Sequence, residues 1–394
     1  MAIGLQVAGT DMTQAPAGGT LAAEFIQDPA AAEAIWRRFE GDPGSLQTPY
    51  QRFDWTMAYL RATGQGANTR VLLIRDGEGR PQILLPLVLE RAFGLRVART
   101  VGDTHANYHL PLFASREAAA MPAGIITAAL AQAGRSAGID VYALQHQPRT
   151  WDGAVNPLAA FGEPEASNGY GLTLDADPEA TLRRVFSGDA RKKLRSKEKR
   201  LIEAKGAVAY RRAETEEEAA RFLAAFYVHK AERFAAMGIV DPYADPSVRA
   251  FLRAAAAGPE PAVEMHALCL AETGRVLATF GGAVSGRRYS GMMTAFDPDP
   301  EIARYSPGDL LLQHLVREQA ARGRLGFDLG VGEARYKASI CDETIELVES
   351  IIPVTLMGRT YGALRQGLVR AKRGIKRDPR LYAALQRLRK LRRA

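Results

Sequence analysis

The sequence predicts an α/β (α+β) protein built from two successive units, each with a mixed central sheet, followed by a basic helical tail. Three observations support this fold class. At 394 residues the chain exceeds one ordinary domain. Strand-like and helix-like segments alternate along it, as they do in layered α/β structures. The same coarse order of elements occurs in each half, although no repeat is detectable at the level of single residues.

The first unit is expected at residues 21–170, after a flexible leader at 1–20 that is rich in small and polar residues. Asp28-Pro29 is typical of a helix start. The turn Asp76-Gly-Glu-Gly79 between two apolar runs predicts a hairpin. The expected elements are helices at 28–40, 53–61 and 122–137 and strands at 70–75, 82–90 and 140–144.

The second unit is expected at residues 171–357, and the tail at 358–394. Turn residues separate its apolar runs, so a meander of strands is predicted in its middle. The expected elements are helices at 178–205, 215–237, 246–257 and 307–322 and strands at 208–212, 264–271, 276–285, 288–295, 325–329 and 346–355. The last of these strands is expected to complete the second unit.

The composition is that of an ordinary globular protein, with 47% hydrophobic and 24% charged residues. Cys269 and Cys341 are too few for a disulfide framework or a zinc cluster. No apolar run approaches the roughly 20 residues that cross a bilayer, and no signal peptide is evident. We therefore expect a cytoplasmic protein, with peripheral attachment to the inner face of the membrane as an alternative.

The net charge of +8 is concentrated at the end of the chain, because residues 365–394 contain twelve basic residues and one acid. Asp378-Pro379 is expected to divide the tail into two helices. Apolar residues recur at helical spacing, at Tyr361, Leu364, Leu368, Leu381, Tyr382, Leu385 and Leu388. This stripe either packs on the body or docks on an anionic membrane surface. Nucleic-acid binding is less favoured, because interleaved aromatic residues are missing.

The segment Ser306-Pro-Gly308 predicts a helix start with exposed backbone N–H groups. Pro307 presets the backbone for the first helical turn, and Ser306 stands where an N-cap belongs. The partial positive charge of such a helix end suits an anion such as a diphosphate. A plain helix cap without a ligand is the alternative.

Several of these segments resemble a known family. The order Ser306-Pro-Gly308, Phe327-Asp328 and Gly332…Tyr336-Lys337 resembles the second half of the GNAT-type acyltransferases associated with bacterial cellulose and polysaccharide biosynthesis, the CelD-type group. These enzymes are relatives of the Fem-type peptidoglycan aminoacyltransferases. The resemblance spans residues 45–355 and extends to three further segments, Thr48–Trp55, Arg191–Leu201 and Phe226–Arg233.

The resemblance implies tandem GNAT-like (acyl-CoA N-acyltransferase) domains that use acetyl-CoA or a longer acyl-CoA. It implies a small-molecule acceptor, or one linked to a saccharide or a lipid. The chain lacks the Arg-x-x-Gly-x-Gly/Ala loop that binds pyrophosphate in ordinary GNAT enzymes. The backbone at the predicted helix start is therefore the expected coenzyme site, which comprises Tyr305, Ser306, Pro307, Gly308 and Asp309.

Three residues are predicted to be catalytic. Asp328 follows an apolar run between two glycines, where burial would raise its pKa and suit it to act as a base. Its alternative role is to pair with Arg335 or Lys337. Tyr336 would protonate the leaving thiolate, a role that tyrosine has in many GNAT enzymes. Lys337 would bind an acidic group or the oxyanion, with a plain surface charge as its alternative.

Substrate contacts are predicted for His229, Arg233 and Glu333. His229 and Arg233 share one helical face, although a structural histidine is the alternative, and Glu333 is also an alternative base. The basic segment at 191–205 is either a solvated helix face or an attractor for the 3′-phosphate of coenzyme A. His105 and His109 lie in an expected loop, and no metal site is predicted.

The predicted reaction is direct attack of an amine or hydroxyl on an acyl thioester. The chain has no Gly-x-Ser-x-Gly elbow, and no serine or cysteine is indicated as a nucleophile, so a covalent intermediate is not expected. The resemblance links this acetyl or acyl transfer to cellulose or exopolysaccharide biosynthesis. The alternatives are a Fem-type transferase that depends on aminoacyl-tRNA, and a non-catalytic adaptor tethered to a membrane by its tail.

Overall fold

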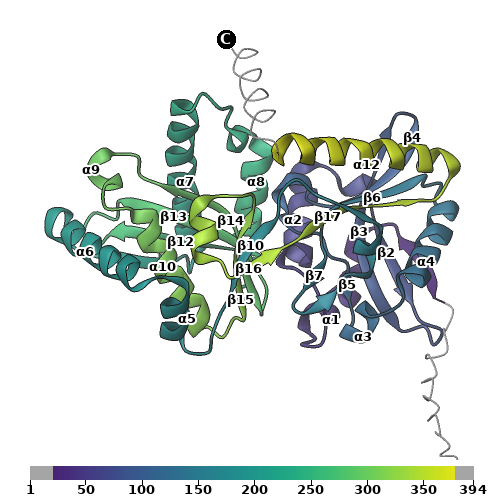
Figure 1. The fold of residues 1–394 in the computed structure, drawn as a ribbon, viewed down its shortest axis with the longest axis horizontal. Helices are drawn as coiled ribbons and strands as arrows, with labels where there is room; N and C mark the ends of the chain where they lie inside the picture. Colours follow the sequence, from purple (N-terminus) through teal and green to yellow (C-terminus); the bar gives the residue numbers. More distant parts are fainter. Residues whose placement is uncertain (1–20, 378–394) are drawn as a thin grey trace, which may run out of the picture.

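The computed structural model describes residues 21–377 as two α/β halves that lie side by side (Figure 1). The first half contains a mixed sheet in the order β1-β2-β3-β4-β6-β17-β9, with β5 beside β3. Its strands are β1 (Ala22–Ile26), β2 (Thr69–Arg75), β3 (Pro81–Ala92), β4 (Leu95–Thr100), β5 (Leu112–Phe113), β6 (Val141–Pro148), β9 (Gly162–Pro164) and β17 (Leu347–Pro353). The short strands β7 (Thr150–Trp151) and β8 (Ala154–Val155) pair with each other.

The second half contains a mixed sheet in the order β11-β12-β13-β14-β15-β10-β16. Its strands are β10 (Gly169–Thr173), β11 (Val208–Arg212), β12 (Val263–Leu270), β13 (Val276–Val284), β14 (Arg288–Phe296), β15 (Gly326–Val331) and β16 (Glu343–Ile345). β11 to β14 form an antiparallel meander, whereas β14 and β15 run parallel. The predicted meander and the mixed character of both sheets are confirmed.

Helices cover the sheets of both halves (Figure 1). Those of the first half are α1 (Glu33–Gly41), α2 (Phe53–Thr63), α3 (Arg116–Ala119) and α4 (Ala123–Ser136). Those of the second half are α5 (Pro178–Val185), α6 (Gly188–Lys205), α7 (Glu216–Ala236), α8 (Pro246–Ala255), α9 (Pro300–Ala303), α10 (Pro307–Ala321) and α11 (Arg335–Ile340). The last described helix, α12 (Leu356–Arg377), crosses back over the first half.

One strand from the end of the described chain belongs to the first sheet. β17 pairs with β6, where Ile351 lies opposite Ala143. The prediction that strand 346–355 completes the second unit is therefore wrong. Its apolar residues complete the core of the first sheet, and Figure 1 shows β17 running into that sheet. The limits 21–170 and 171–357 remain a prediction about sequence units, because β10 spans the first limit and β17 returns to the first sheet.

The two halves also share one continuous hydrophobic core. Trp55 of α2 meets Phe251 of α8 edge to face, with ring centroids 5.0 Å apart, and Tyr59 meets the same ring at 5.4 Å. Trp55 and Phe251 are fully buried. Burial of such a side chain stabilises a fold by about 1.5–3 kcal/mol, so this contact holds α2 and α8 together firmly.

Other differences from the sequence prediction are local. β1 and β4 were not predicted, and the expected helix at 178–205 is divided into α5 and α6. The division occurs because Phe186 is extended and Ser187 caps a new helix, accepting a hydrogen bond from the N–H of Ala190 at 3.2 Å. After the strand β15, where no helix was predicted, residues 335–340 form the short helix α11.

The described part of the tail is one helix, and its leucines do not pack on the body. Leu364 and Leu368 are exposed, whereas Gly358 and Gly362 face the first half. A Cβ on Gly358 would lie 1.9 Å from the carbonyl oxygen of Asp140, so only glycine allows this approach. The predicted division at Asp378-Pro379, the stripe at Leu381, Tyr382, Leu385 and Leu388, and the leader at 1–20 lie outside the described residues.

Candidate active site

Strands β14 and β15 run parallel over only three residue pairs and then separate. The last pair joins Ser290 to Asp328. Beyond it, β14 remains paired with β13, and a shift in their register leaves Met292 without a partner between the pairs of Gly281 and Gly282. Such a bulge bends a strand, and here it accompanies the separation of β14 from β15. The pairing of the two parallel strands therefore has a gap beyond Ser290 and Asp328.

A loop of the first half enters the point of this separation. The Asn107 side chain donates a hydrogen bond from Nδ2 to the carbonyl oxygen of Gly291 at 2.9 Å. Its Oδ1 accepts one from the N–H of Val331 at 3.4 Å. A Cβ on Gly330, which has a φ of 73°, would lie 2.7 Å from Nδ2. Glycine at this position thus allows Asn107 to bridge the two separating strands.

The carboxylate of Asp328 is fully buried where the halves meet. Its Oδ1 accepts hydrogen bonds from Ser290 Oγ at 2.8 Å, the N–H of Gly330 at 3.0 Å and Tyr108 Oη at 3.2 Å. Its Oδ2 has no hydrogen-bond partner among the described residues and lies 3.6 Å from Arg288 Nη1. Burial raises the pKa of Asp328 to about 6, although the charge of Arg288 opposes this shift.

Arg288 is the buried cation nearest to this carboxylate. It pairs with Glu343 at 2.9 Å and lies 3.8 Å from Asp152. Its guanidinium also covers the ring of Trp151 at 4.4 Å from the centroid. Lys337, one pairing partner considered for Asp328 in the sequence, does not take this place, and the side chain of Arg335, the other, lies outside the described part of the structure. The partner is Arg288, which no sequence pattern indicated because it lies at the start of an apolar strand.

The segment Thr48–Trp55 contributes to the same network. Tyr50 Oη is 2.9 Å from Ser290 Oγ and accepts a hydrogen bond from Asn107 Nδ2 at 2.5 Å. Tyr50, Tyr108 and Ser290 are all buried. Burial, followed by the negative charge of Asp328, raises the pKa values of both tyrosines well above the usual value. A chain of neutral hydroxyl groups therefore surrounds the buried carboxylate.

Lys337 is buried and is not a surface charge. Its side chain is 7% exposed, and Nζ donates hydrogen bonds to the carbonyl oxygens of Gly330 at 3.1 Å and Val331 at 3.2 Å. Burial lowers the pKa of Lys337, and the charge of Asp328 opposes this shift. Lys337 thus fastens α11 to the end of β15, close to the carboxylate.

Four of the predicted site residues gather beside the end of β14. The Cα of Gly308 lies against Phe296, since a Cβ built on it would be 3.7 Å from the ring. The guanidinium of Arg233 is 5.6 Å from the centroid of that same ring. Burial raises the pKa of the Tyr336 phenol, the charge of Arg233 lowers it and that of Asp309 raises it. Tyr336 is half-exposed, so its hydroxyl remains available to a ligand.

The other two predicted substrate residues have different surroundings. His229 of α7 is partly buried, and its Nδ1 is buried without a hydrogen-bond partner among the described residues. Burial lowers the pKa of His229, so its imidazole is neutral near pH 7. Glu333 forms an ion pair with Lys376 of α12 and accepts a hydrogen bond from the N–H of Asn168 at 3.3 Å. Glu333 thereby connects the site loop with the tail helix.

The start of α10 is positively polarised and has a lysine beside it. Ser306 is in the left-handed region, with φ of 54°, and its side chain makes no cap hydrogen bond. Instead, Ser306 Oγ accepts a hydrogen bond from Lys197 of α6. Tyr305 is buried, and its hydroxyl accepts from Arg304 at 2.8 Å, so this residue presents only its backbone. Pro307 occupies the first helical position, as predicted.

The basic helix α6 is largely a solvated face, and its attraction of a coenzyme phosphate remains a prediction. Leu194 and Leu201 are buried, and most of its lysines and arginines face solvent. Lys197 differs from them, because it is partly buried at the start of α10. One lysine of the basic segment therefore lies where a bound anion would be attracted.

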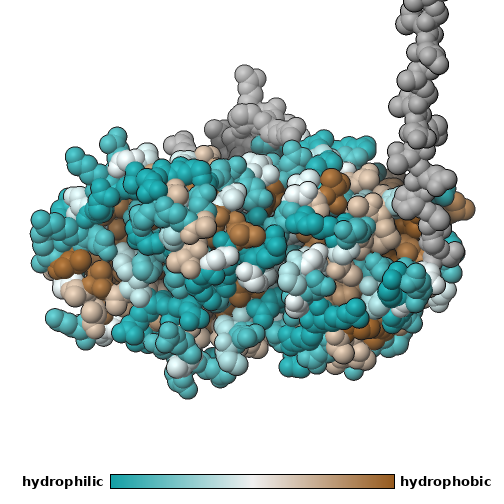
Figure 2. Space-filling view, turned by 90° about the horizontal axis from the view of Figure 1, so that it is seen from below, coloured by the Kyte–Doolittle hydropathy of each residue, from teal (hydrophilic) through white to brown (hydrophobic). Residues whose placement is uncertain are grey.

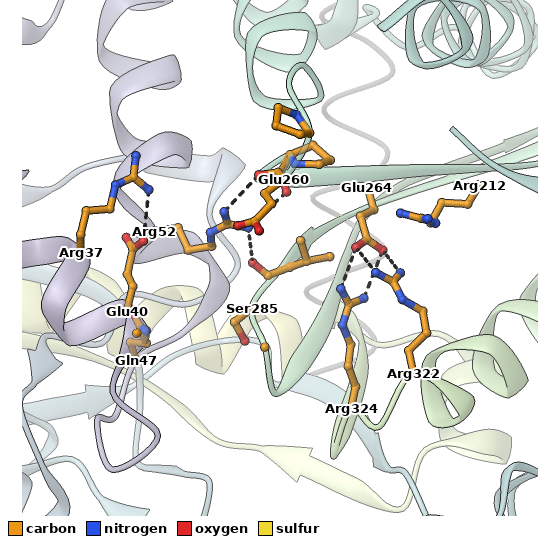
Figure 3. A pocket seen from close by; sticks show the side chains of 15 residues that line it. Arg37, Glu40, Gln47, Arg52, Arg212, Glu260, Glu264, Ser285, Arg322 and Arg324 are labelled. Carbon is orange, nitrogen blue, oxygen red and sulfur yellow. Dashed lines mark hydrogen bonds and ion pairs between the residues drawn. The ribbon is translucent and has the colours of Figure 1, made fainter. Parts of the chain in front are cut away.

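A groove of about 520 Å³ lies near α1 and the turn between β13 and β14, and residues of both halves line it (Figure 3). Glu264 is buried in its wall, where Arg322 holds it at 2.6 Å and Arg324 at 2.7 Å. Arg52 donates hydrogen bonds to backbone oxygens of the facing half, at 3.1 and 3.2 Å. These arginines come from separate segments of the chain, so no local pattern in the sequence indicated the groove.

Residues 21–377 contain neither a cluster of metal-binding side chains nor a membrane-spanning helix. No group of three or more His, Cys, Asp or Glu in this part of the chain is arranged to hold a metal ion. No helix within the same residues is long and apolar enough to span a membrane. His109, considered for metal binding, instead has its two ring nitrogens 3.0 Å from the carbonyl oxygens of Gln145 and Val101.

Comparison with known proteins confirms the predicted enzyme class. Residues 188–338 match the family model described as an acetyltransferase (GNAT) domain. This range contains α6, α7, α10, β14, β15 and the start of α11. Residues 188–338 thus correspond to a GNAT-type acetyltransferase domain, which supports the predicted class of N-acyltransferase. No curated protein matches the sequence.

Solved structures with the same fold cover most of the chain. FemX aligns with 86% of this chain and 99% of its own, at 11% identity and a TM-score of 0.56. A Bacteroides thetaiotaomicron protein of unknown function aligns with 83% of this chain and 99% of its own, at 10% identity and a TM-score of 0.51. A tandem GNAT protein from the clavulanic acid pathway aligns with 85% and 99%, at 12% identity and a TM-score of 0.42. The predicted fold class is confirmed.

Proposed function

We propose that the protein transfers an acetyl or longer acyl group from acyl-CoA to an amine or hydroxyl acceptor at the gap between β14 and β15. One observation carries this proposal. β14 and β15 part after Ser290, and the start of α10 and the half-exposed Tyr336 lie further along, beside the end of β14. A thioester bound along this gap would have its phosphates at a helix N-terminus and its carbonyl near a phenol.

The residues present suit the diphosphate of a coenzyme. The backbone N–H of Gly308 is at the open end of α10, and Lys197 adds a positive charge at Ser306. Gly308 has only Phe296 near its missing side chain, so the approach to the backbone is open. The carboxylate of Asp309 in the first turn repels an anion. The segment also lacks the glycine pattern of the usual pyrophosphate loop. We therefore expect weaker diphosphate binding than such a loop provides.

In the proposed reaction the acceptor nitrogen or oxygen attacks the thioester carbonyl carbon, and the C–S bond breaks. Tyr336 would donate its phenolic proton to the leaving thiolate. Asp328 would accept the acceptor's proton once the acceptor displaces the groups that cover it, because the carboxylate and its neighbour Ser290 are both sealed from solvent. Lys337 would position α11 and the end of β15 rather than contact the substrate.

The acceptor is proposed from the resemblance to enzymes of cellulose and exopolysaccharide biosynthesis. A small molecule or a saccharide- or lipid-linked amine or hydroxyl would then meet His229 and Arg233. Glu333 would take part after release from Lys376. A second candidate is a Fem-type reaction with aminoacyl-tRNA, which the shared fold with FemX over 86% of the chain favours.

Calorimetric titration with acetyl-CoA and longer acyl-CoAs tests the proposal, followed by assay of thiol release with candidate acceptors. We expect binding that weakens as salt is raised, because part of it is electrostatic. Absence of binding at low salt by folded protein would contradict the use of acyl-CoA. RNA that co-purifies with the protein and disappears on RNase treatment would then favour the tRNA-dependent reaction.

A further inference from the structure

Helix α12 exposes an apolar stripe to solvent along the outer side of the first half. Leu364 and Leu368, one helical turn apart, are 72% and 64% exposed. Leu356 and Met357 at the start of the helix are exposed as well. A stripe at this spacing on a helix of a globular protein usually faces the core. Here it faces outward, so it lacks a partner within the described chain.

The helix is fixed with this stripe outward. Gly358 packs against the backbone of Asp140, and a Cβ on Gly362 would lie 2.9 Å from Ile351. Arg365 pairs with the buried carboxylate of Glu349 at 2.5 Å. Two further ion pairs, Arg370 with Glu163 and Lys376 with Glu333, hold the later turns. Rotation that buried the leucines would break all of these contacts.

The charged residues of α12 itself all have one sign, and three of them pair with acids of the body. Residues 356–377 contain seven lysines and arginines and no acid, and six more basic residues follow them in the sequence. Arg359, Arg370 and Lys372 of α12 are exposed. Each Lys or Arg close to an anionic membrane surface contributes about 1 kcal/mol of attraction. The surface around the leucines is thus complementary to negatively charged lipid.

The hairpin between β3 and β4 adds a second apolar element beside α12. Phe93 at its tip is 93% exposed, and the neighbouring Arg91 is exposed too. Ala92 and Leu95 belong to the cluster in which Tyr361 of α12 packs, and Figure 1 shows the hairpin rising beside the helix. An exposed aromatic residue flanked by a basic one is typical of membrane-interface contacts.

The face seen in Figure 2 differs from this one. Hydrophilic residues dominate it, and apolar residues are scattered among them. Apolar residues are scattered on this face, whereas α12 exposes a row of them among basic residues. The side of α12 is therefore the one suited to contact with a lipid surface.

We propose that the outer face of α12 and the tip of the β3–β4 hairpin dock on the surface of a bilayer that contains anionic phospholipid. The helix lies parallel to the membrane, with Leu364, Leu368 and Phe93 entering the headgroup region and the basic residues contacting lipid phosphates. This proposal does not depend on the transfer reaction. Because Lys376 contacts Glu333, docking also places the loop that follows β15 near the membrane surface.

Co-sedimentation of the full chain with vesicles tests the proposal. One set of vesicles contains phosphatidylglycerol mixed with phosphatidylcholine, and the other phosphatidylcholine alone. We expect wild-type binding to the first set that falls with salt. The double variant Leu364→Gln/Leu368→Gln should bind at least about tenfold more weakly, which corresponds to about 1.4 kcal/mol. Phe93→Ser should weaken binding by a smaller factor.

The matched control is Val228→Gln/Val240→Gln, which replaces two exposed aliphatic residues of the second half. This control should bind as the wild type does, and circular dichroism should show all variants folded. Three results would overturn the proposal: equal binding by wild type and the leucine variant, no preference for phosphatidylglycerol, or a wild-type dimer that the leucine variant dissociates. The last result would identify a second copy of the chain as the occupant of the stripe.

Discussion

The two halves contain the same separation of parallel strands but fill it differently. In the first half, β4 and β6 pair from Val97 to Arg99 and then diverge, as β14 and β15 do in the second. The buried ring of His109 spans the first gap, between the carbonyl oxygens of Val101 and Gln145. The helices α4 and α10 hold equivalent places in the order of elements, each between the two parting strands.

Among the described residues, Asn107 bridges the second gap where β14 and β15 begin to part. Partly exposed groups lie further along, beside the end of β14. Its helix start has Lys197 beside it, whereas the first turn of α4 has no charged residue. With the proposed function, the same arrangement of strands would serve as a filled scaffold in one half and as a reaction site in the other. Paired substitutions at equivalent positions of the two halves test this division.

The largest effect is expected at the two helix starts. Gly308→Glu puts a carboxylate at the second residue of α10, and acyl-CoA binding should weaken by about 100-fold or more because like charges repel. Gly124→Glu makes the same change at the second residue of α4, where a Cβ has no neighbour within 4 Å. This control should leave binding unchanged. Calorimetry that found both variants equally weak would contradict the division.

A smaller but large effect is expected for Asp328→Asn. The variant should lower kcat/KM by about 100-fold, the usual contribution of a general base. Wild-type activity should rise with pH through the pKa of about 6, because the carboxylate form is required, and the variant should lack this limb. The folded pKa is raised, so the stability of the wild type relative to the variant should fall as pH rises from about 4 to about 6. An unchanged pH profile of kcat/KM would assign Asp328 a structural role only.

Tyr336→Phe sharpens the comparison at the open end of the gap. Loss of the phenolic proton should lower kcat by about 10- to 100-fold, with acyl-CoA binding unchanged. Tyr361→Phe is the control, since it also removes a partly buried hydroxyl, which accepts a hydrogen bond from Arg99 at 2.9 Å. Turnover and titration together check the result. Equal loss of turnover in the two variants would indicate a general effect on stability.

The smallest effect on activity is expected for His109→Gln in the filled gap. Turnover should remain, while the free energy of unfolding should fall by about 1–3 kcal/mol through lost contacts with carbonyl oxygens. Burial lowers the pKa of His109 to about 3, so its stabilisation is complete above the unfolded pKa of about 6.5 and is lost as pH falls toward 3. Chemical denaturation across this range should show a shallower pH dependence in the variant, and a loss of turnover larger than that of Asp328→Asn would contradict the scaffold role.

Local patterns predicted most of the fold. The meander of β12, β13 and β14, the helix start at Pro307 and the strand before Asp328 follow from periodicity, turn residues and capping. The return of β17 to the first sheet could not be predicted, because an apolar strand does not specify which sheet it joins. The sequence order suggested the wrong sheet for β17.

The candidate site was predicted less completely. Residues close in sequence, such as Asp328, Tyr336 and Lys337, were recognised together. Arg288, Ser290, Asn107 and Tyr108 were missed, because they come from segments distant from Asp328 in the sequence and only the folded chain brings them to the site. The burial of Lys337 was missed for a related reason, since its hydrogen bonds to Gly330 and Val331 depend on the left-handed turn at Gly330.

The place of β17 in the first sheet has a consequence for the order of folding during synthesis. A chain that has emerged from the ribosome only as far as β6 exposes that strand's edge, because its neighbour β17 ends at Pro353. Most multidomain proteins complete their N-terminal domain first, while translation continues. Here the N-terminal sheet must wait for nearly the entire chain. An unpaired central strand invites aggregation, so this protein should depend on chaperones or slow collapse until translation ends.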